Sequence, residues 1–425
     1  WAVQADWLPS IGASYHLGVD GISLPLLLLT AGVGLLCLIA LPARRFARGD
    51  VYAWLLLLQG ALFGVFLALD TLLFFVFWEL MLVPAYFLIA AGGGAAARRA
   101  ALRFFMFTFG GSAFLLLGIL ILVQNSPGRS FDMLGLAAAA PPSSLVQGAC
   151  FLLLLIGLGV KMPFFPLHGW LPSAYTEAPP AVTMFLSGVM AKAGAYGLFR
   201  IVYPMLPDAA GAYSLTLATL GAITIIYGAA LAYSRRTPQA MFAYSSLSHM
   251  GFVLLGLAAA TPMGLAGALF VMISHGLISP LLFFLSGIFS ERGHVREFPD
   301  AAGLYTAMPI AGVFFAFAAL ANLGLPGLSA FAGEFFTLLG TYPVLIGAVV
   351  AALIGLILAA AYNLRAIRQL LMGEPGRPAA DLGGVDLTIS VPLVLGIAGL
   401  GLFPTLLFRL FDPPVTAILS RLGGM

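Results

Sequence analysis

Lys161 and Lys192 are the only lysines among the 425 residues, and each lies in an otherwise apolar run. The stretch between them holds five prolines together with His168 and Glu177, so we expect its first helix to break at membrane depth. A charge inside a membrane costs about 2.5 to 3.5 kcal/mol on insertion scales, and such residues mark ion or proton pathways. Two amines beside a broken helix therefore indicate a route for protons or other ions.

Glu79 lies in the middle of another apolar run, FFVFWELMLVP at 74–84. A buried carboxylate is either protonated or close to a cation, and Lys161 is the expected partner. Because such a pair titrates as one coupled unit, separating the two groups makes the lysine release its proton more readily. The pair would then act as a proton switch. The alternative is an ion pair that only sets the register of two helices.

Lys192 lies among small residues, in GVMAKAGAYG at 188–197, which permit close approach of neighbouring helices. It could pass a proton from the first half of the chain towards the second. The alternative is a lysine whose amine extends to the membrane surface, although its place near mid-span makes that reach awkward.

Glu334 follows a second expected break at Pro326 and Gly327. Such a break frees backbone groups that neighbours or water must satisfy, and water is what a carboxylate proton site needs. Glu334 could also cap the positive end of the helix that resumes there. The two roles are compatible.

His249 and His275 lie within predicted spans, and His168 lies in the first break. Imidazole both takes and gives protons near neutral pH, so these residues could connect the lysines to Glu334. The alternative for each is a histidine that is hydrogen-bonded to a backbone carbonyl. Hydroxyl groups that could hold connecting water are those of Tyr244, Ser245, Ser246, Ser248 and Ser274.

The elements that must position these residues are membrane helices. The chain is 61% hydrophobic and 8% charged, and apolar runs of about 20 residues recur along it. This composition excludes a soluble globular protein, and the alternating ten-residue segments of a closed barrel are absent. We therefore predict an all-α, polytopic membrane helix bundle.

No metal or redox cofactor is expected in this chain. Cys37 and Cys150 have no cysteine or histidine at ligand spacing, and the five histidines are scattered. No G-x-G-x-x-G fingerprint follows a strand. Nothing in the sequence indicates nucleic-acid binding. Asp20 and Asp70 lie at the ends of predicted spans, where helix capping is the expected role.

Twelve spans are predicted. They cover 22–41, 52–69, 71–91, 102–123, 145–162, 181–203, 212–233, 240–260, 264–289, 307–325 with a continuation to 340, 343–364 and 388–408.

The arginines set the expected orientation. Alternating the loops between two sides puts thirteen arginines on one side and four on the other, which makes the first side cytoplasmic. The four are Arg129, Arg200, Arg409 and Arg421. The thirteen are Arg44, Arg45, Arg48, Arg98, Arg99, Arg103, Arg235, Arg236, Arg292, Arg296, Arg365, Arg368 and Arg377. Both ends of the chain then face the periplasm. The arginine pairs are expected to anchor this topology and, secondarily, to contact anionic lipids.

Two sets of five spans repeat one design. Residues 52–203 and 212–372 each contain five spans of which the fourth is broken, with Lys161 and Glu334 near the breaks. Because five is odd, the two sets enter the membrane from opposite sides and would be inverted repeats, an arrangement typical of transport proteins. Residues 1–51 and 388–425 would flank them as an N-terminal span with its loops and a C-terminal span with its tail.

The motifs around these residues resemble the antiporter-like, proton-translocating subunits of respiratory complex I (NADH-quinone oxidoreductase), most closely the M type, chain 4. They are FFVFWELMLVP at 74–84, VKMPFFPLHGWLP at 160–172, LPGLSAFAGEF at 325–335 and HLGVDGIS at 16–23. The resemblance covers essentially the whole chain. It implies a fold of fourteen helices, of which twelve are visible, so a preceding segment is expected beyond Trp1.

The resemblance also implies roles. The family's carboxylate-lysine pair corresponds to Glu79 and Lys161, its connecting lysine to Lys192, and its distal proton residue to Glu334. His249 and His275 match its central histidines. Members carry no redox centre. The parent complex would hold FMN, iron-sulfur clusters and quinone in other subunits. Partners would be neighbouring antiporter-like subunits and lipids.

The expected function is therefore proton translocation in a bacterial inner membrane, coupled to electron transfer in other subunits of a translocase. The alternatives are a subunit of an Mrp-type Na⁺/H⁺ antiporter, a subunit of a membrane-bound hydrogenase complex, and an inert scaffold. Related subunits of the Mrp type carry lysine at the distal position, so Glu334 favours the M type.

Overall fold

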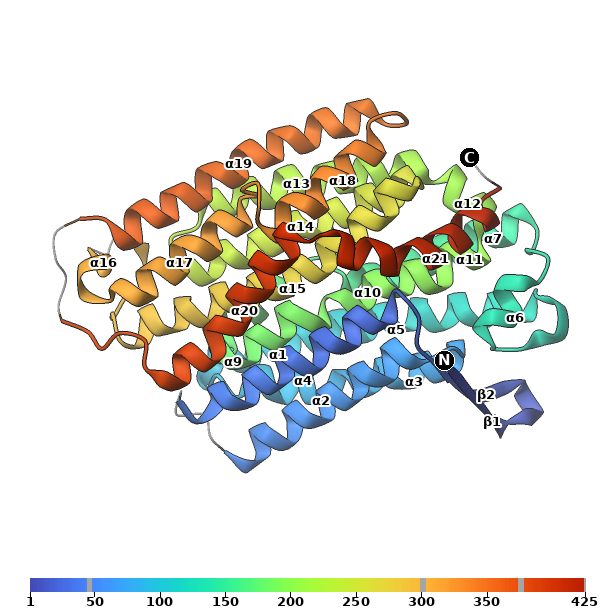
Figure 1. Cartoon of the computed structure of the whole chain (residues 1–425). Coiled ribbons are helices and arrows are strands. Elements are labelled where there is room, and N and C mark those ends of the chain that lie inside the picture. The colour runs from blue at the N-terminus through green and yellow to red at the C-terminus, as the bar shows by residue number, and fades with distance from the viewer. Residues whose placement is uncertain (44–47, 299–302, 374–377, 424–425) are drawn as a thin grey trace.

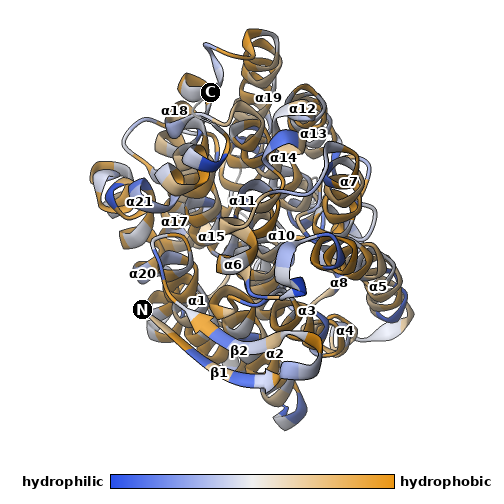
Figure 2. Ribbon diagram, turned by 90° about the vertical axis from the view of Figure 1, so that its right-hand side faces the viewer, coloured by the Kyte–Doolittle hydropathy of each residue, from blue (hydrophilic) through white to orange (hydrophobic). Residues whose placement is uncertain are grey.

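The structure is a computed structural model that describes residues 1–43, 48–298, 303–373 and 378–423. Its long helices lie side by side in one bundle, with a short hairpin projecting from one end (Figure 1). Apolar residues dominate the ribbons throughout the bundle, and the polar ones gather mostly at helix ends and in loops (Figure 2). The predicted all-α membrane fold is confirmed. Arg44, Arg45 and Arg377, expected as topology anchors, lie outside the described residues.

Within the described ranges, eleven helices are long and apolar enough to cross a membrane. They are α1 (Ser23–Ala43), α2 (Gly49–Leu67), α3 with α4 (Thr71–Leu80, Leu82–Ala90), α5 (Gly94–Gln124), α7 (Ser144–Lys161), an interrupted helix over Pro180–Met205, α13 (Ser214–Ser234), α14 (Pro238–Ala259), α15 (Pro262–Glu291), α19 (Ile346–Leu371) and α20 (Gly384–Leu402). The remaining predicted span, 307–325 with a continuation to 340, consists of two shorter helices, α17 (Pro309–Asn322) and α18 (Ser329–Thr341). Each predicted span thus contains helix.

Both predicted breaks are present. Helix α7 ends at Lys161, and the chain is not helical again until α8 (Leu171–Glu177), because Pro163 and Pro166 lack the N–H groups that would continue it. The indole of Trp170 donates to the carbonyl of Val160 at 2.7 Å, which satisfies one of the acceptors at this helix end. Between α17 and α18, Gly324 and Gly327 adopt φ values of +81° and +91° around Pro326. The division into two inverted repeats stays a prediction.

The helix that carries Lys192 is irregular. It runs through α9 (Pro180–Phe185), the π-helical η3 (Leu186–Met190), α10 (Lys192–Gly197), the π-helical η4 (Leu198–Val202) and α11 (Tyr203–Met205). Each π segment shifts the hydrogen-bond pattern by one residue, a feature frequent at functional sites. Gly194 lets α10 approach the last turn of α7, since a Cβ there would lie 2.3 Å from the carbonyl oxygen of Leu158.

Two regions differ from the predicted spans and loops. The first 18 residues form an antiparallel hairpin of β1 (Ala2–Leu8) and β2 (Ala13–Gly18), where a loop was expected. At the other end, the span predicted over 388–408 stops at Leu402, and α21 (Thr405–Arg421) replaces the expected tail. The remaining short elements are η1 (Pro9–Ile11), η2 (Pro127–Arg129), α6 (Met133–Ala138), α12 (Pro207–Ala212) and α16 (Leu304–Ala307).

Two aspartates cap helices and also join distant segments, which confirms the predicted role. Asp20 accepts from the N–H groups of Ile22 and Ser23 at 3.0 Å and pairs with Arg200 at 2.7 Å. Burial opposes ionisation of Asp20, but the Arg200 guanidinium and these N–H groups hold its pKa below the usual value. The pair ties the start of α1 to the irregular helix of Lys192.

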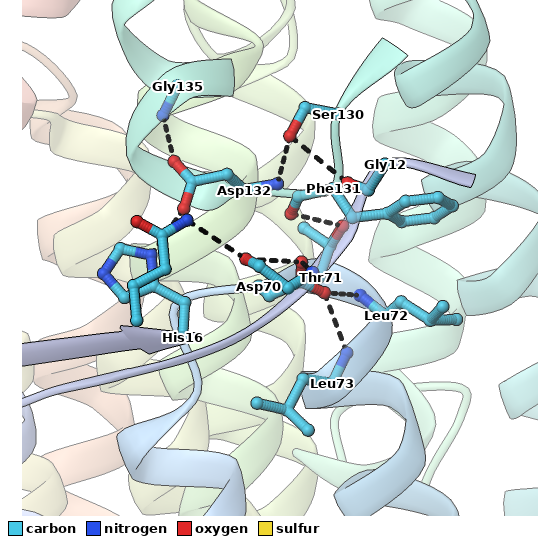
Figure 3. A network of polar contacts seen from close by, with 12 residues as sticks. Gly12, His16, Asp70, Thr71, Leu72, Leu73, Ser130, Phe131, Asp132 and Gly135 are labelled. Carbon is cyan, nitrogen blue, oxygen red and sulfur yellow. Dashed lines mark hydrogen bonds and ion pairs between the residues drawn. The ribbon is translucent and has the colours of Figure 1, made fainter. Parts of the chain in front are cut away.

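Asp70 and Asp132 fasten the hairpin to the bundle (Figure 3). One oxygen of Asp70 caps α3 by accepting from Leu72 and Leu73, and the other accepts from the backbone N–H of Ser14 at 2.9 Å. Asp132 caps α6, and its second oxygen lies 2.5 Å from Nδ1 of His16. Each carboxylate therefore serves a helix and the hairpin at once.

Replacing Asp70 with alanine is expected to lower the free energy of unfolding by about 1 to 2 kcal/mol, because α3 loses its cap. The hairpin also loses the acceptor for Ser14. We expect a lower melting temperature and faster proteolysis within residues 1–18. Asp6→Ala, an exposed aspartate in β1, is the matched control. Equal protease resistance in the two variants would contradict the anchoring role.

Candidate functional site

Lys192 and His275 meet where the two halves of the chain pack together. The ammonium Nζ of Lys192 lies 2.7 Å from Nδ1 of His275 on α15 and also donates to the carbonyl of Ser187 in η3. Lys192 is fully buried, and His275 is 4% exposed. One proton lies between the two nitrogens, because either the ammonium donates to a neutral imidazole or the imidazole donates to a neutral amine.

His249 on α14 connects to Glu334 on α18. Its Nδ1 lies 3.0 Å from Oε1 of Glu334, and its Nε2 lies 3.0 Å from Oδ1 of Asn322. Both charged side chains are at most 6% exposed. Gly324, which has φ +81°, leaves room for the second carboxylate oxygen, because a Cβ there would lie 2.8 Å from Oε2.

Asn322 determines where the protons of His249 lie. Its Nδ2 donates to Oγ of Ser245 at 2.9 Å and to Oδ1 of Asn363 at 3.2 Å, so its own oxygen faces His249. That oxygen only accepts, and therefore Nε2 of His249 must carry a proton. The contact between His249 and Glu334 then holds one proton, which lies on the carboxyl group beside a neutral imidazole or on the imidazole beside a carboxylate.

A small cavity separates these two pairs. Its volume is about 10 Å³, close to what one water molecule needs. The ring centroids of His249 and His275 are 5.4 Å apart. The cavity is lined by His249, Val271, Ser274, His275, Ile278, Asn322, Ala330 and Glu334. Proton transfer between the Lys192–His275 pair and the His249–Glu334 pair therefore requires a rotation of an imidazole or a bridging water.

The Glu79–Lys161 pair is not a direct contact in this conformation. Nζ of Lys161 donates to the carbonyl of Trp78 at 3.4 Å and lies 4.4 Å from the centroid of its ring. Lys161 is 1% exposed, and Glu79 interacts with it electrostatically. Among the described residues, Oε1 of Glu79 is buried without a hydrogen-bond partner. The carbonyl and ring of Trp78 thus take the place that was predicted for the carboxylate.

Lys161 and Lys192 lie on helices that pack together, without a described hydrogen bond between the two amines. Lys161 is the last residue of α7, and Gly194 of α10 packs on the backbone of Leu158 and Met162 in and after that turn. A proton moving from Lys161 to Lys192 would therefore have to cross the α7–α10 contact. Among the predicted steps of the proton route, this one has no hydrogen bond between its two groups in the described part of the structure.

The residues predicted as further relays divide into two groups. Oγ of Ser274 lies 2.7 Å from Oγ of Ser329 at the central cavity, and Ser245 contacts both Asn322 and the hydroxyl of Tyr362. The others lie apart. Ser248 bonds the carbonyl of Ile225, Ser246 that of Phe242, Tyr244 lies beneath the Arg235 guanidinium, and His168 packs against Tyr227.

Asn322 and Asn363 are the contributors that sequence reasoning missed. Both are buried asparagines within apolar helices, and a buried amide in a membrane span is itself a signal of a polar network. In the described part of the chain, no group of three or more histidine, cysteine, aspartate or glutamate residues could hold a metal ion.

Known proteins resemble this chain over nearly its whole length. A family model described as NADH:quinone oxidoreductase/Mrp antiporter, transmembrane, matches residues 68–360. NAD(P)H-quinone oxidoreductase chain 4 1 of Synechococcus sp. (strain JA-3-3Ab) is 42% identical, covering 99% of this chain and 82% of that protein. NADH-quinone oxidoreductase subunit M of Rickettsia bellii (strain RML369-C) is 36% identical, over 98% of this chain and 85% of that protein. A chain of respiratory complex I from Thermus thermophilus with bound NADH superimposes with a TM-score of 0.94 at 32% sequence identity. The match covers 100% of this chain and 90% of that chain.

Proposed function

This chain belongs to the NADH:quinone oxidoreductase/Mrp antiporter family, and from that membership we propose that it is the M-type, proton-translocating membrane subunit of an NADH:quinone oxidoreductase. Its relatives of that name match nearly the whole chain, and the matching solved chain is part of respiratory complex I. Neighbouring membrane subunits are the proposed partners. Electron transfer would take place in other subunits, which would hold FMN, iron-sulfur clusters and quinone.

The observation that carries this proposal is the row of buried groups Lys192, His275, His249 and Glu334. Lys192 lies 2.7 Å from His275, and His249 lies 3.0 Å from Glu334. The two histidines line the same cavity of about 10 Å³. Each of these groups can take and give a proton. Burying four ionisable groups destabilises the fold, and a protein that served only as a scaffold would have no need of them. The row connects α10, which carries Lys192 after the first break, to α18, which carries Glu334 after the second break.

The route begins at Glu79 and Lys161. A charge arriving from a neighbouring subunit would move Glu79 towards or away from Lys161 and change the proton affinity of that amine. Protons would then pass through Lys192 and the two histidines to Glu334. We place the arginine-rich end in the cytoplasm of a bacterium and release on the opposite face, following the arginine bias.

Replacing Glu79 with glutamine is expected to lower NADH-driven proton pumping in membrane vesicles by about tenfold, because the amide cannot tune Lys161 electrostatically. The effect is smaller than loss of a transferring group, since Glu79 does not touch Lys161 directly. Assembly is checked on a native gel. Glu177→Gln, a partly exposed carboxylate beyond the first break, is the control and should pump normally.

Two results would move the assignment. Wild-type pumping by Glu79→Gln would remove Glu79 from the route. Transport that continues without NADH and follows a sodium gradient would instead indicate an antiporter of the Mrp type.

A further inference from the structure

A second cavity opens at the arginine-rich end, between α8, α9, α14 and α15. Its volume is about 200 Å³, and polar and apolar groups share its walls. Thr176 and Ser290 are partly exposed at its mouth beside the exposed Glu291, whereas Tyr175, Thr183 and Phe283 are 1% exposed. The cavity therefore leads from the surface into the bundle. The remaining lining residues are Ala178, Pro180, Gln239 and Gly287.

The buried wall of this cavity is bonded to the segment that holds Lys192. The hydroxyl of Tyr175 donates to the carbonyl of Leu186 at 3.2 Å, and that of Thr183 donates to the carbonyl of Tyr175 at the same distance. The next residue after Leu186 is Ser187, whose carbonyl accepts from Lys192. One helical turn thus separates the cavity from the acceptor of the Lys192 ammonium.

A row of hydroxyls on α15 leads from the same cavity to His275. Ser290, Ser286, Ser279 and His275 lie within about 60° of one another around a helix of 3.6 residues per turn. Ser279 and Ser286 are 3% and 1% exposed. In the part of the chain that the structure describes, their hydroxyl oxygens have no hydrogen-bond partner. Buried polar groups of this kind are the usual partners of internal water.

Pro280 adds an acceptor to this row. Having no N–H, it leaves the carbonyl of Gly276 without its helical donor, one residue after His275. The π segment η3 packs closely on that carbonyl, since a Cβ at Gly188 would lie 3.2 Å from it. The carbonyl of Gly276 is therefore an acceptor at the interface between η3 and α15.

We infer that this cavity is an aqueous inlet through which protons from the arginine-rich face reach the Lys192–His275 pair directly, without passing through Lys161. The inference rests on the proposed proton transport. Water in the cavity carries protons to Thr183 and Ser290, and water held by Ser286 and Ser279 carries them on to His275. The inlet delivers protons to Lys192 and His275. It therefore bypasses the step between Lys161 and Lys192, for which no connecting hydrogen bond is described.

The test blocks the inlet covalently in the assembled complex. Ser290→Cys places a thiol in the cavity, and Ser234→Cys places one on the exposed end of α13 at the same face. The two native cysteines of this chain, Cys37 and Cys150, are fully buried, and the complex with the unmodified chain gives the labelling background of the other subunits. A membrane-impermeant methanethiosulfonate reagent is added to inside-out vesicles. We expect both variants to be labelled and only modified Ser290→Cys to lose pumping, by about tenfold.

Labelling does not depend on proton transport, so the two proposals fail separately. An unlabelled Ser290→Cys, or a modified one that pumps like modified Ser234→Cys, would overturn the inlet. Normal pumping after loss of Lys192 would overturn the proposed function instead, whatever the labelling shows.

The hydroxyl row is tested without added bulk. Ser279→Ala combined with Ser286→Ala should lower the protons pumped per electron pair by about fivefold, because water loses its two anchors. Ser390 is the matched control, since it is another fully buried hydroxyl without a described partner but lines no such cavity. Ser390→Ala should pump normally. If the double variant and Ser390→Ala pumped the same number of protons per electron pair, the hydroxyls of Ser279 and Ser286 would have no part in proton transfer.

Discussion

Replacing Lys192 with methionine is expected to lower proton pumping by about a hundredfold and to leave assembly of the complex intact. Nζ of Lys192, in the first half of the chain, lies 2.7 Å from Nδ1 of His275. Methionine fills a similar volume without an ionisable atom, so the imidazole loses the partner with which it shares a proton. The fold should tolerate the change, because removal of the amine leaves His275 as a neutral imidazole and not as an unpaired buried charge.

Lys192→Arg separates a proton carrier from a fixed charge. Arginine keeps the positive charge but stays protonated in proteins, so it cannot pass its proton to His275. A carrier role predicts that arginine fails as completely as methionine, whereas a fixed charge predicts near-normal pumping. The readout is the number of protons moved per electron pair in sealed vesicles, with the NADH oxidation rate as internal reference. Normal pumping by Lys192→Arg would contradict the carrier role.

The sequence was sufficient for the spans and the breaks because each depends on local chemistry. Proline removes a donor, and the combinations of Pro163 with Pro166 and of Pro326 with Gly327 predict broken helices, whereas the single Pro280 lies within the continuous α15. An ionisable residue in an apolar run is improbable unless it has a role, which is why Lys161, Lys192 and Glu334 could be selected. In the structure Lys192, His275, His249 and Glu334 lie in one row, whose individual contacts the sequence did not predict.

The contacts themselves depend on packing that a linear pattern does not contain. The pairing of Lys161 with the carbonyl of Trp78 follows from the approach of two helices, and no spacing in the chain distinguishes it from a pair with Glu79. The part played by Asn322 follows from three partners on other helices. The π segments around Lys192, LSGVM and LFRIV, have no sequence signature, since apolar residues and glycine are common throughout membrane helices.

The hairpin was missed for a different reason. A strand is recognised by alternation of apolar and polar residues, and VQADW at 3–7 does alternate, but the signal is short and all seven residues of β1 are exposed, so the strand has no buried face. Its stability comes instead from Asp70 and Asp132, which lie more than 50 residues further along the chain. Only the folded arrangement brings these carboxylates to Ser14 and His16.

The largest effect in the second half is expected from Glu334→Gln, which should lower pumping by about a hundredfold with assembly retained. Glutamine keeps the shape of the side chain and can still hydrogen-bond His249. Because Asn322 requires a proton on Nε2 of His249, the amide of glutamine can only donate to Nδ1 of the neutral imidazole. The amide itself neither binds nor releases a proton, so the pair loses the group that would pass a proton beyond His249.

Asp386→Asn supplies the matched control for that change. Asp386 is a buried carboxylate of the same half, 3% exposed, but it pairs with Arg292 at 2.8 Å, away from the histidines. Its loss leaves a partly buried guanidinium unpaired and should reduce the amount of assembled complex, while the complex that does assemble pumps a normal number of protons per electron pair. Glu334→Gln should show the opposite pattern. Equal proton-to-electron ratios in the two variants would mean that Glu334 only holds α18 in place, and the exit for protons would have to pass through other residues around the central cavity.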